Sequence, residues 1–534
     1  MHCRCIRHTD LPHTSRLFAD LIYHFDRVRG FYQHAPQAAD SFSAAAGQVR
    51  LDPAHRARLV AALAEENRDG SEAARLNLDR LAQPETLVVA TGQQVGLYTG
   101  PVYTIYKALT AARLATELTA RGIPSVPVFW LATEDHDLAE VKHAWVFDAA
   151  QRPVRLEAAA SPERNQPVGG VRLDDNAASS LQAALAGLPF GEEVGRLAAE
   201  DYAGGATFAS GFKRLLARLL APYGVLLLDP QSAELRRLAA PVLAQAIEKA
   251  PELTAALLAR GKELEAAGYH TQVHMEEKTS LFFLLENGRR TALRRSGDSY
   301  TGNGAVHTRA ELRKRLELRP EDFSPNALLR PVVQDYLLPT VAYIGGPAEL
   351  AYLAQAEVLY ARELGRMPVA LPRACFTILD ARGEKLLGRY GLEFTDALHD
   401  ATALEQRIAE TLIPPPLEQT FRGSHGQIEE ALQAVDAQLL AFDPTLAAAM
   451  AKSRRKIEYQ FSKIRAKAAR ESLRRTERAR ADAAYLSGLI FPEKVLQERL
   501  YSVLPFLARH GMDLMGQLHH AIRFDCPDHQ VLVA

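Results

Sequence analysis

Long apolar runs are missing from this chain of 534 residues, and so is an excess of charge of either sign. No stretch approaches the roughly 20 consecutive apolar residues of a membrane-spanning helix. The N-terminal segment MHCRCIRHTD is polar and has no apolar core of the kind found in secretory signals. The formal net charge of −1 argues against a molecule that binds polyanions with its whole surface. We therefore expect a cytoplasmic protein with no membrane partner.

Cysteine is scarce, with four residues in the chain. A reducing cytoplasm argues against disulfides. Cys3 and Cys5, beside His2 and His8, have the residue types of a metal site, but no second Cys or His pair stands at ligand spacing. We favour the alternative, a mobile N-terminus with two free thiols. The sequence therefore predicts no metal requirement.

Strands and helices alternate through much of the chain, whose length suggests two to four domains of roughly 100–200 residues. Thr86–Ala90 and Val126–Ala132 are short apolar runs typical of buried strands, and Val102–Arg121 between them is an amphipathic helix. This order predicts a βαβ crossover and a parallel sheet. The same pattern returns in later segments: helix Phe208–Leu220 before the strand GVLLLD, strand Thr340–Ile344 before a helix from Ala348, and strand Val369–Leu371.

Two segments interrupt this pattern, and a helical region follows it. Residues 144–174 read as β-hairpins, and residues 279–300 contain Asn287-Gly288 between two strand-like runs, a strong hairpin signal. Beyond Thr377, apolar residues recur at heptad spacing on both sides of Asp443-Pro444, which predicts an antiparallel helical hairpin or coiled coil. The seam contains Ile428, Leu432, Val435, Leu439, Phe442, Ile457, Phe461, Ile464 and Ala468. We expect the tail HQVLVA to close the core sheet.

A glycine-rich loop, TGQQVGLYTGP at residues 91–101, follows the first strand and opens the helix. Ligands bind at such strand ends in open α/β sheets, and a helix N-terminus offers free N–H groups to an anion. The loop matches neither a P-loop nor a dinucleotide fingerprint. Lys107 could neutralise a carboxylate or phosphate. The candidate substrate-binding residues are Gln93, Gln94, Gly96, Thr99, Gly100, Tyr103 and Lys107. The alternative is a tight turn with packing glycines.

Four ionisable residues, Glu134, Asp135, His136 and Asp137, follow the second strand. Such groups at the end of a buried strand are costly unless they are paired or liganded. His136 could be a general base or acid, with Asp135 or Asp137 orienting its ring. The carboxylates could instead bind a substrate ammonium group. A metal site and a capping network remain alternatives, although no second histidine at ligand spacing is obvious.

Two further segments are candidates. In RPVVQD and YIGGPAE, the guanidinium of Arg330 could clamp a carboxylate and the glycine turn could offer amides to an anion. The candidates here are Arg330, Gln334, Gly345 and Gly346; the alternative for Arg330 is a surface or interdomain salt bridge. Residues 452–480 hold twelve Lys or Arg and three Glu. We interpret this run as a solvated helix face or a contact to an acidic partner subunit rather than a nucleic-acid site, because no reading motif accompanies it.

The longest motifs resemble one family. TGQQVGLYTGPVYTIYKALTA, followed by VFWLATEDHDLAEV, resembles the bacillithiol biosynthesis cysteine-adding enzymes. SPNALLRPVVQDYLLPTVAYIGGPAELAYLAQ is similar to the later motif of that family. LFADLIYHFDRVRGFY and DCPDHQVLV also fit, so the resemblance extends from near residue 15 to the end of the chain.

The resemblance implies a Rossmann-like core akin to class I nucleotidyltransferases, with inserted connecting subdomains and a C-terminal antiparallel coiled coil that pairs two subunits into a homodimer. It implies a ligase that joins the carboxyl group of cysteine to the amine of glucosaminyl malate, making bacillithiol. It also implies a bound adenine nucleotide, ATP or ADP, for which Gln497 and Arg499 are candidates. The predicted boundaries are core 1–143, 207–265 and 323–376, insertions 144–206 and 266–322, coiled coil 377–490, and a segment returning to the core at 491–534.

Amide formation needs an activated carboxyl group, a neutral amine and a stabilised oxyanion. As hypotheses, His136 or a neighbouring carboxylate deprotonates the sugar amine, and the amides near Gly96–Gly100 with Lys107 hold an anionic group such as the malate. Glu134, Asp135 and Asp137 would position ammonium or hydroxyl groups. Two other functions stay open. They are a metal-dependent amino-sugar hydrolase or deacetylase using the EDHD loop, and a coiled-coil scaffold or RNA-binding protein using the basic helix.

Overall fold

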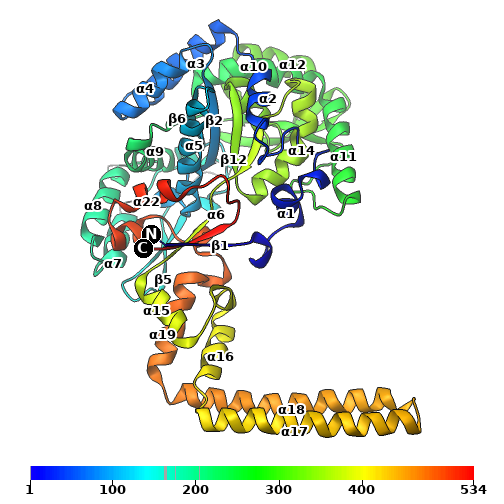
Figure 1. Ribbon diagram of the computed structural model, residues 1–534. Coiled ribbons are helices and arrows are strands. Elements are labelled where there is room, and N and C mark those ends of the chain that lie inside the picture. Colours follow the sequence, from blue (N-terminus) through cyan, green and yellow to red (C-terminus); the bar gives the residue numbers. More distant parts are fainter. Residues whose placement is uncertain (1, 161–164, 175, 204) are drawn as a thin grey trace. The chain divides into compact units, whose positions relative to one another are not determined.

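The computed structural model describes residues 2–160, 165–174, 176–203 and 205–534 (Figure 1). The chain forms two compact units. The first covers Met1–Ala149, Val154–Thr377 and Glu498–Leu532, and the second covers Ala150–Pro153, Ile378–Gln497 and Val533–Ala534. Within the described ranges, no helix combines the length and the apolar character needed to cross a membrane. The finer domain boundaries given above stay predictions.

A five-stranded parallel sheet forms the centre of the first unit, as predicted. Its order is β13-β12-β2-β3-β6. The chain runs from β2 to β3 and β6 on one side and then returns to β12 on the other side of β2. This reversal between β2 and β12 is a topological switch, the place where open α/β sheets bind ligands. The strands are β2 (Leu87–Gln94), β3 (Ser125–Ala132), β6 (Leu226–Leu228), β12 (Thr340–Gly345) and β13 (Val369–Pro372).

Side chains of the sheet alternate between two apolar cores. Val88 and Val126 belong to one core, together with residues of α10 (Ala233–Glu248) and α14 (Pro347–Glu363). Val89 belongs to the other, with residues of α5 (Tyr103–Ala120). Because helices cover both faces, the strands contain short apolar runs, and these runs predict the strands from the sequence.

The remaining helices and the short 3-10 turns fill the space around these elements. The helices before the second unit are α1 (Arg16–Tyr23), α2 (Ser41–Gln48), α3 (Pro53–Glu66), α4 (Glu72–Leu81), α6 (Leu138–Val141), α7 (Asn176–Leu185), α8 (Gly191–Tyr202), α9 (Phe208–Leu219), α11 (Ala250–Ala266), α12 (Arg309–Leu318) and α13 (Arg330–Leu337). Those near the C-terminus are α20 (Gln497–Leu500), α21 (Leu504–His510) and α22 (Leu514–Ala521).

Two expectations for the chain ends are wrong. The N-terminus is not mobile, because it forms β1 (His2–Ile6). The tail forms β15 (His529–Val533), which joins a separate three-stranded sheet of order β1-β15-β14 and not the core sheet. Strand β14 is Phe376–Leu379. The sequence HCRCI does not predict β1, because it has one β-branched residue, no aromatic residue and only five residues in all.

The loop at residues 91–101 also differs from expectation, because β2 continues through Gln94 and the turn comes later. Tyr98 and Thr99 adopt positive φ angles of 52° and 69°, just before Gly100 at 65°. The two glutamines therefore stand on a rigid strand, beside the corresponding end of β3.

The predicted hairpin at residues 279–300 is confirmed. Strands β7 (Thr279–Glu286) and β8 (Arg289–Ser296) are antiparallel, and Asn287 and Gly288 between them both have positive φ, as a two-residue hairpin turn requires. They belong to a sheet of order β10-β9-β8-β7-β11 with β9 (Ser299–Gly302), β10 (Ala305–Thr308) and β11 (Phe323–Pro325). In the other segment, β4 (His143–Phe147) pairs with β5 (Pro153–Glu157), while residues 161–164 lie outside the described residues.

The second unit is helical. Its helices are α15 (Ala381–Tyr390), α16 (Ala401–Thr411), α17 (Pro415–Phe442), α18 (Leu446–Arg474) and α19 (Glu477–Ile490). The long helices α17 and α18 lie side by side, joined by a short turn, which confirms the predicted hairpin (Figure 1). Phe421 packs edge-on against Phe461, and Arg454 pairs with Glu429 across the two helices.

Candidate active site

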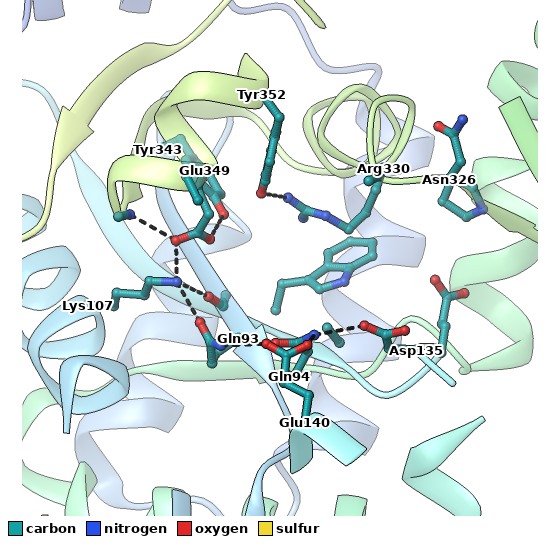
Figure 2. A pocket seen from close by; sticks show the side chains of 18 of the residues that line it. Gln93, Gln94, Lys107, Asp135, Glu140, Asn326, Arg330, Tyr343, Glu349 and Tyr352 are labelled. Atoms are coloured by element: carbon teal, nitrogen blue, oxygen red, sulfur yellow. Dashed lines mark hydrogen bonds and ion pairs between the residues drawn. The ribbon is translucent and has the colours of Figure 1, made fainter. Parts of the chain in front are cut away.

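A cavity of about 460 Å³ lies at the carboxyl ends of β2, β3 and β12, at the topological switch (Figure 2). The hairpin sheet contributes Phe283 and Arg290 to its wall, α13 contributes Arg330, and Arg373 and Arg499 complete it. All of these residues belong to the first unit. Its volume suits a small polar molecule rather than a macromolecule.

A buried ion pair closes one wall of this cavity. Lys107 on α5 contacts Glu349 on α14, and its ammonium also donates to Gly92 O at 3.0 Å and Gln93 Oε1 at 2.7 Å. Glu349 further accepts from Tyr343 Oη at 2.7 Å and from the Gly346 amide at 2.9 Å. Burial alone would raise the pKa of Glu349, but the charge of Lys107 and these hydrogen bonds outweigh it and hold that pKa below its usual value. Glu349 is therefore a carboxylate, and both Lys107 and the Gly346 amide already have a partner within the protein.

Two carboxylates share one amide donor. Gln94 Nε2 donates to Asp135 Oδ2 at 2.9 Å and to Glu140 Oε2 at 2.7 Å (Figure 2). Partial burial, with the charges of Asp135 and Asp137, raises the pKa of Glu140, and the hydrogen bond from Gln94 opposes this shift. Burial would raise the pKa of Asp135 too, but hydrogen bonds from Gln94 and the His136 amide and the charge of Arg290 hold it below its usual value. Two neighbouring carboxyl groups with oppositely shifted pKa values are suited to separate roles as acid or base and as fixed anion.

Arg330 is a cation in the pocket wall. Its guanidinium donates to Tyr352 Oη at 2.7 Å and to Gln334 Oε1 at 3.1 Å, and lies 6.0 Å from the centroid of the Tyr343 ring. It has no carboxylate ion-pair partner among the described residues. An arginine held by neutral groups beside a cavity is equipped to bind an anionic group of a ligand. The surface salt bridge that was the alternative for Arg330 is not found among those residues.

Arg290 links the hairpin sheet to the strand ends. It donates to Ser324 and to Pro325 O, stacks on the Phe283 ring at 3.9 Å, and lies 3.9 Å from Asp135 Oδ1. Its Nη1 is also 3.5 Å from His136 Nδ1.

The predicted residues divide into two groups. Those that line the cavity are Gln93, Gln94, Tyr103, Lys107, Glu134, Asp135, Arg330, Gly346 and Arg499. Those that do not are Gly96, Thr99, Gly100, His136, Asp137, Gln334, Gly345 and Gln497. The amides of Gly96 and Gly100 donate to Gln94 O and Leu97 O within their own turn. Gln334 is buried and accepts from Arg330, so it positions that guanidinium from behind.

The four residues of the EDHD loop do not converge on one point. Glu134 is buried and pairs with Arg236, and burial raises its pKa despite that charge. Asp137 is the N-cap of α6 and accepts from the Glu140 amide at 3.2 Å. His136 is 40% exposed beside Asp135, outside the cavity lining. Among the described residues, these four side chains do not come together as ligands of one metal ion, which does not favour the metal site or the hydrolase that would use this loop.

One group of possible metal ligands lies elsewhere in the first unit. Among the described residues, Cys375, Glu498 and His529 are buried and bring ligand atoms within 4.8 Å of one another. Arg373 occupies the same place, because it donates to Glu498 at 2.9 and 2.7 Å and to Cys375 Sγ at 3.2 Å. Burial raises the pKa of Cys375 to about 12 and lowers that of His529 to about 4. A guanidinium next to a protonated thiol disfavours a cation, so we interpret this group as a buried polar network.

Gln497, predicted to bind a nucleotide, is buried. Its side chain accepts from the Ile378 amide and donates to the carbonyl oxygens of Ile378 and Leu489. Arg499 is exposed and lines the cavity, and it has no hydrogen-bond or ion-pair partner among the described residues. The structure therefore separates the two candidates, and only Arg499 is available to a ligand in this cavity.

Sequence reasoning missed several cavity residues, among them Glu140, Glu349, Tyr352 and Arg290. Glu349 had a usable signal, because a buried lysine requires a carboxylate and Glu349 occupies the capping position three residues after Gly346. Arg290 had none, since its place depends on how the hairpin sheet packs against the strand ends.

The parallel sheet, with a polar cavity at its switch point, defines the class of Rossmann-like α/β proteins that bind small molecules at their strand ends. The family model "Bacillithiol biosynthesis BshC, N-terminal Rossmann-like domain" matches residues 1–374, and "Bacillithiol biosynthesis BshC, C-terminal coiled-coil domain" matches residues 376–534. A protein of Solibacter usitatus named "Putative cysteine ligase BshC" is 52% identical over 533 residues, 100% of both chains. The protein of the same name from Koribacter versatilis is 40% identical over 99% of both chains. The chain belongs to the bacillithiol biosynthesis BshC family.

The Lys107–Glu349 pair leads to a prediction about stability. Lys107→Met and Glu349→Gln each leave one buried group without its partner, so each is expected to lower the free energy of unfolding of the first unit by about 3–5 kcal/mol. The double variant should lose less than the sum of the two, because neither charge is then stranded. Urea unfolding followed by tryptophan fluorescence measures this, since Trp130 and Trp145 both lie in the first unit.

The pair of exposed Arg121 and half-buried Glu117 is the matched control, with an expected effect below about 1 kcal/mol. Because the folded-state pKa of Glu349 is depressed, its contribution is complete above its usual pKa of about 4.3 and is lost as the pH falls through the folded value. Glu349→Gln should therefore lose less stability on acidification than the parent chain. Single variants no less stable than the Arg121 control would show that the pair is not a structural requirement.

Proposed function

We propose that this chain joins the carboxyl group of cysteine to the amine of glucosaminyl malate, forming the amide bond of bacillithiol. The observation that carries the proposal is that the cavity wall holds two carboxylates as well as a guanidinium that has no carboxylate partner among the described residues. Arg330 lies on one side, and Gln94 with the carboxylates of Asp135 and Glu140 lies on the other (Figure 2). Both substrates carry ammonium and carboxylate groups, so a pocket with both signs of charge suits them. Family membership and the names of the relatives support the same reaction class.

The residues of the pocket suggest separate roles. Arg330 binds a carboxylate of the malate, for which its planar guanidinium is suited. Asp135, whose pKa lies below the usual value, stays ionised and holds an ammonium group. Glu140, whose pKa is raised, accepts the proton that the sugar amine must lose before it can attack. His136, our alternative base, lies outside the cavity lining but next to Asp135.

An adenine nucleotide belongs to the proposal as the group that activates the carboxyl group. Arg499 fits its phosphates, since it is an exposed guanidinium in the cavity wall without a described partner. When bound, ATP would activate the carboxyl group of cysteine, because it would make one carboxylate oxygen part of a leaving group. The part of this chain is to hold that phosphate with Arg499 and the acceptor amine with Asp135.

The first test is product analysis by mass spectrometry. Pure protein incubated with glucosaminyl malate, cysteine and ATP is expected to form a compound with the mass of bacillithiol. The Arg330→Met variant, which keeps the aliphatic stem but loses the charge, is expected to form at least tenfold less at limiting glucosaminyl malate. Product only after addition of cell extract would keep the reaction and point to another activated donor. No product in either mixture from folded protein would contradict the ligase.

The roles of Glu140 and His136 can be separated by pH profiles. If Glu140 is the base, it must be ionised, so kcat/KM should rise with pH through the Glu140 pKa, which lies above the usual value of about 4.3. Glu140→Gln should lower kcat by about 10²–10⁴ and remove this limb. Gln94→Ala removes the donor that favours the ionised form, so it should move the limb to higher pH. A larger loss in His136→Ala than in Glu140→Gln would assign the base to His136 instead.

We also propose that the chain works as a homodimer through α17 and α18. Large apolar side chains of this hairpin are exposed although they follow the heptad seam, namely Val435 (49%), Phe442 (84%), Ile457 (40%) and Ile464 (57%). A second copy would remove them from water. Analytical ultracentrifugation should give twice the subunit mass, and Phe442→Ser with Ile464→Ser should shift the protein toward one subunit. A single-subunit mass for the parent chain at micromolar concentration would contradict this proposal.

A further inference from the structure

Three of the four cysteines lie together, although they come from opposite ends of the chain. Cys3 and Cys5 stand two residues apart on β1, so they share a face of that strand. Cys526 precedes β15, the neighbour of β1 in the sheet. The sulfur atoms of Cys5 and Cys526 are 2.8 Å apart, across 521 residues of sequence. Cys3 lies beside them, 3.4 Å from Gln530 Oε1.

The distance between the two sulfur atoms is shorter than two thiols adopt without a specific interaction. A disulfide bond is about 2.05 Å long, so less than about 1 Å of approach separates Cys5 and Cys526 from bonding. The β1–β15 pairing holds the backbone of Cys5 in place, and Cys526 lies three residues before the start of β15. Cys5 is exposed and Cys526 is partly exposed, whereas the fourth cysteine, Cys375, is buried. Only the clustered thiols are therefore open to reagents in solution.

Space for a small reagent exists next to the cluster. A cavity of about 570 Å³ is lined by Cys3, His520, Arg523 and Gln530, and a narrow crevice is lined by Cys526. Arg523 brings positive charge toward the thiols, although it is also paired with Asp525. Such charge favours a thiolate, the reactive form of cysteine, but burial outweighs it at Cys3, whose pKa is raised.

We propose that Cys5 and Cys526 form a redox-active dithiol that reacts with low-molecular-weight disulfides. The Cys526 thiolate attacks one sulfur of the disulfide RSSR, which forms a mixed disulfide and releases the first RS⁻. Cys5 then attacks the Cys526 sulfur, which forms the Cys5–Cys526 disulfide and releases the second RS⁻. The two protein thiols lose two electrons and two protons, and RSSR is reduced to two RSH.

The surroundings of Cys5 bear on the order of the two steps. Burial and the adjacent Cys526 sulfur raise the pKa of Cys5, which disfavours Cys5 as the first thiolate to attack. Reversible disulfides of this kind are the form in which intracellular proteins commonly use cysteine oxidation. The dithiol lies near the termini of the chain and is independent of the proposed ligase reaction.

The test uses the full chain and cystine, the disulfide of cysteine, as the reagent. After reaction and blocking of free thiols, peptide mapping without reductant is expected to show a peptide pair joined through Cys5 and Cys526. One cystine should be consumed per chain, with release of two cysteines. Cys526→Ser and Cys5→Ser should each abolish the link, whereas Cys375→Ser, the buried control, should form it at the same rate. Circular dichroism confirms that each variant is folded.

Several results would overturn the proposal. Separate cysteine adducts on Cys5 and Cys526 without a link would show that the two thiols do not resolve each other. A predominant Cys3–Cys5 link would show that the dithiol is formed by Cys3 and Cys5 and not by Cys5 and Cys526. A stoichiometric zinc ion that is lost in the Cys5→Ser and Cys526→Ser variants would show that the thiols are metal ligands. Reaction rates equal to those of the urea-unfolded chain would show that the folded geometry contributes nothing.

Discussion

The buried contact between Lys107 and Glu349 is the interaction on which the cavity depends. It joins α5, which follows β2, to α14, which follows β12, and these two parallel strands are neighbours at the point where the strand order reverses. Removing two charges from water is costly, and the cost is offset here by Gly92, Gln93, Tyr343 and Gly346, which satisfy the remaining donors and acceptors. The pair therefore orients both helix starts and the ends of both strands.

The ion pair also decides which charged groups of the pocket remain available to a ligand. The charge of Lys107 is neutralised inside the protein, so the cations available to a ligand are Arg330 and Arg499, which have no carboxylate partner among the described residues. On the other side, Gln94 holds Asp135 and Glu140 close enough for one carboxylate to raise the pKa of the other. A pocket of this kind is suited to molecules that carry both charges.

Strands from the two ends of the chain pair in a sheet that is separate from the core sheet. Strands β1, β15 and β14 form their own sheet, and this pairing places Cys5 next to Cys526. The exposed Cys5 and the partly exposed Cys526 are in a different setting from the buried Cys375, which is surrounded by Arg373 and Glu498. The same residue type thus has a reactive setting at the surface and an inert one inside.

The amino-acid sequence alone determined those strands, turns and helices whose pattern lies within a few neighbouring residues. The apolar runs of β2, β3 and β12, the turn Asn287-Gly288 and the heptads of α17 and α18 were predictable because burial on both faces, positive φ and helical periodicity each leave a pattern within a few residues. The long motifs also sufficed to indicate the family. Tertiary structure alone decided which polar side chains meet. Glu349 reaches Lys107, Arg290 reaches Asp135, and Cys526 reaches Cys5 across long stretches of sequence, while Asp137 and Gln497 turn to neighbouring backbone groups. Pairing and desolvation of charged groups depend on distances between elements, and no local pattern encodes those distances.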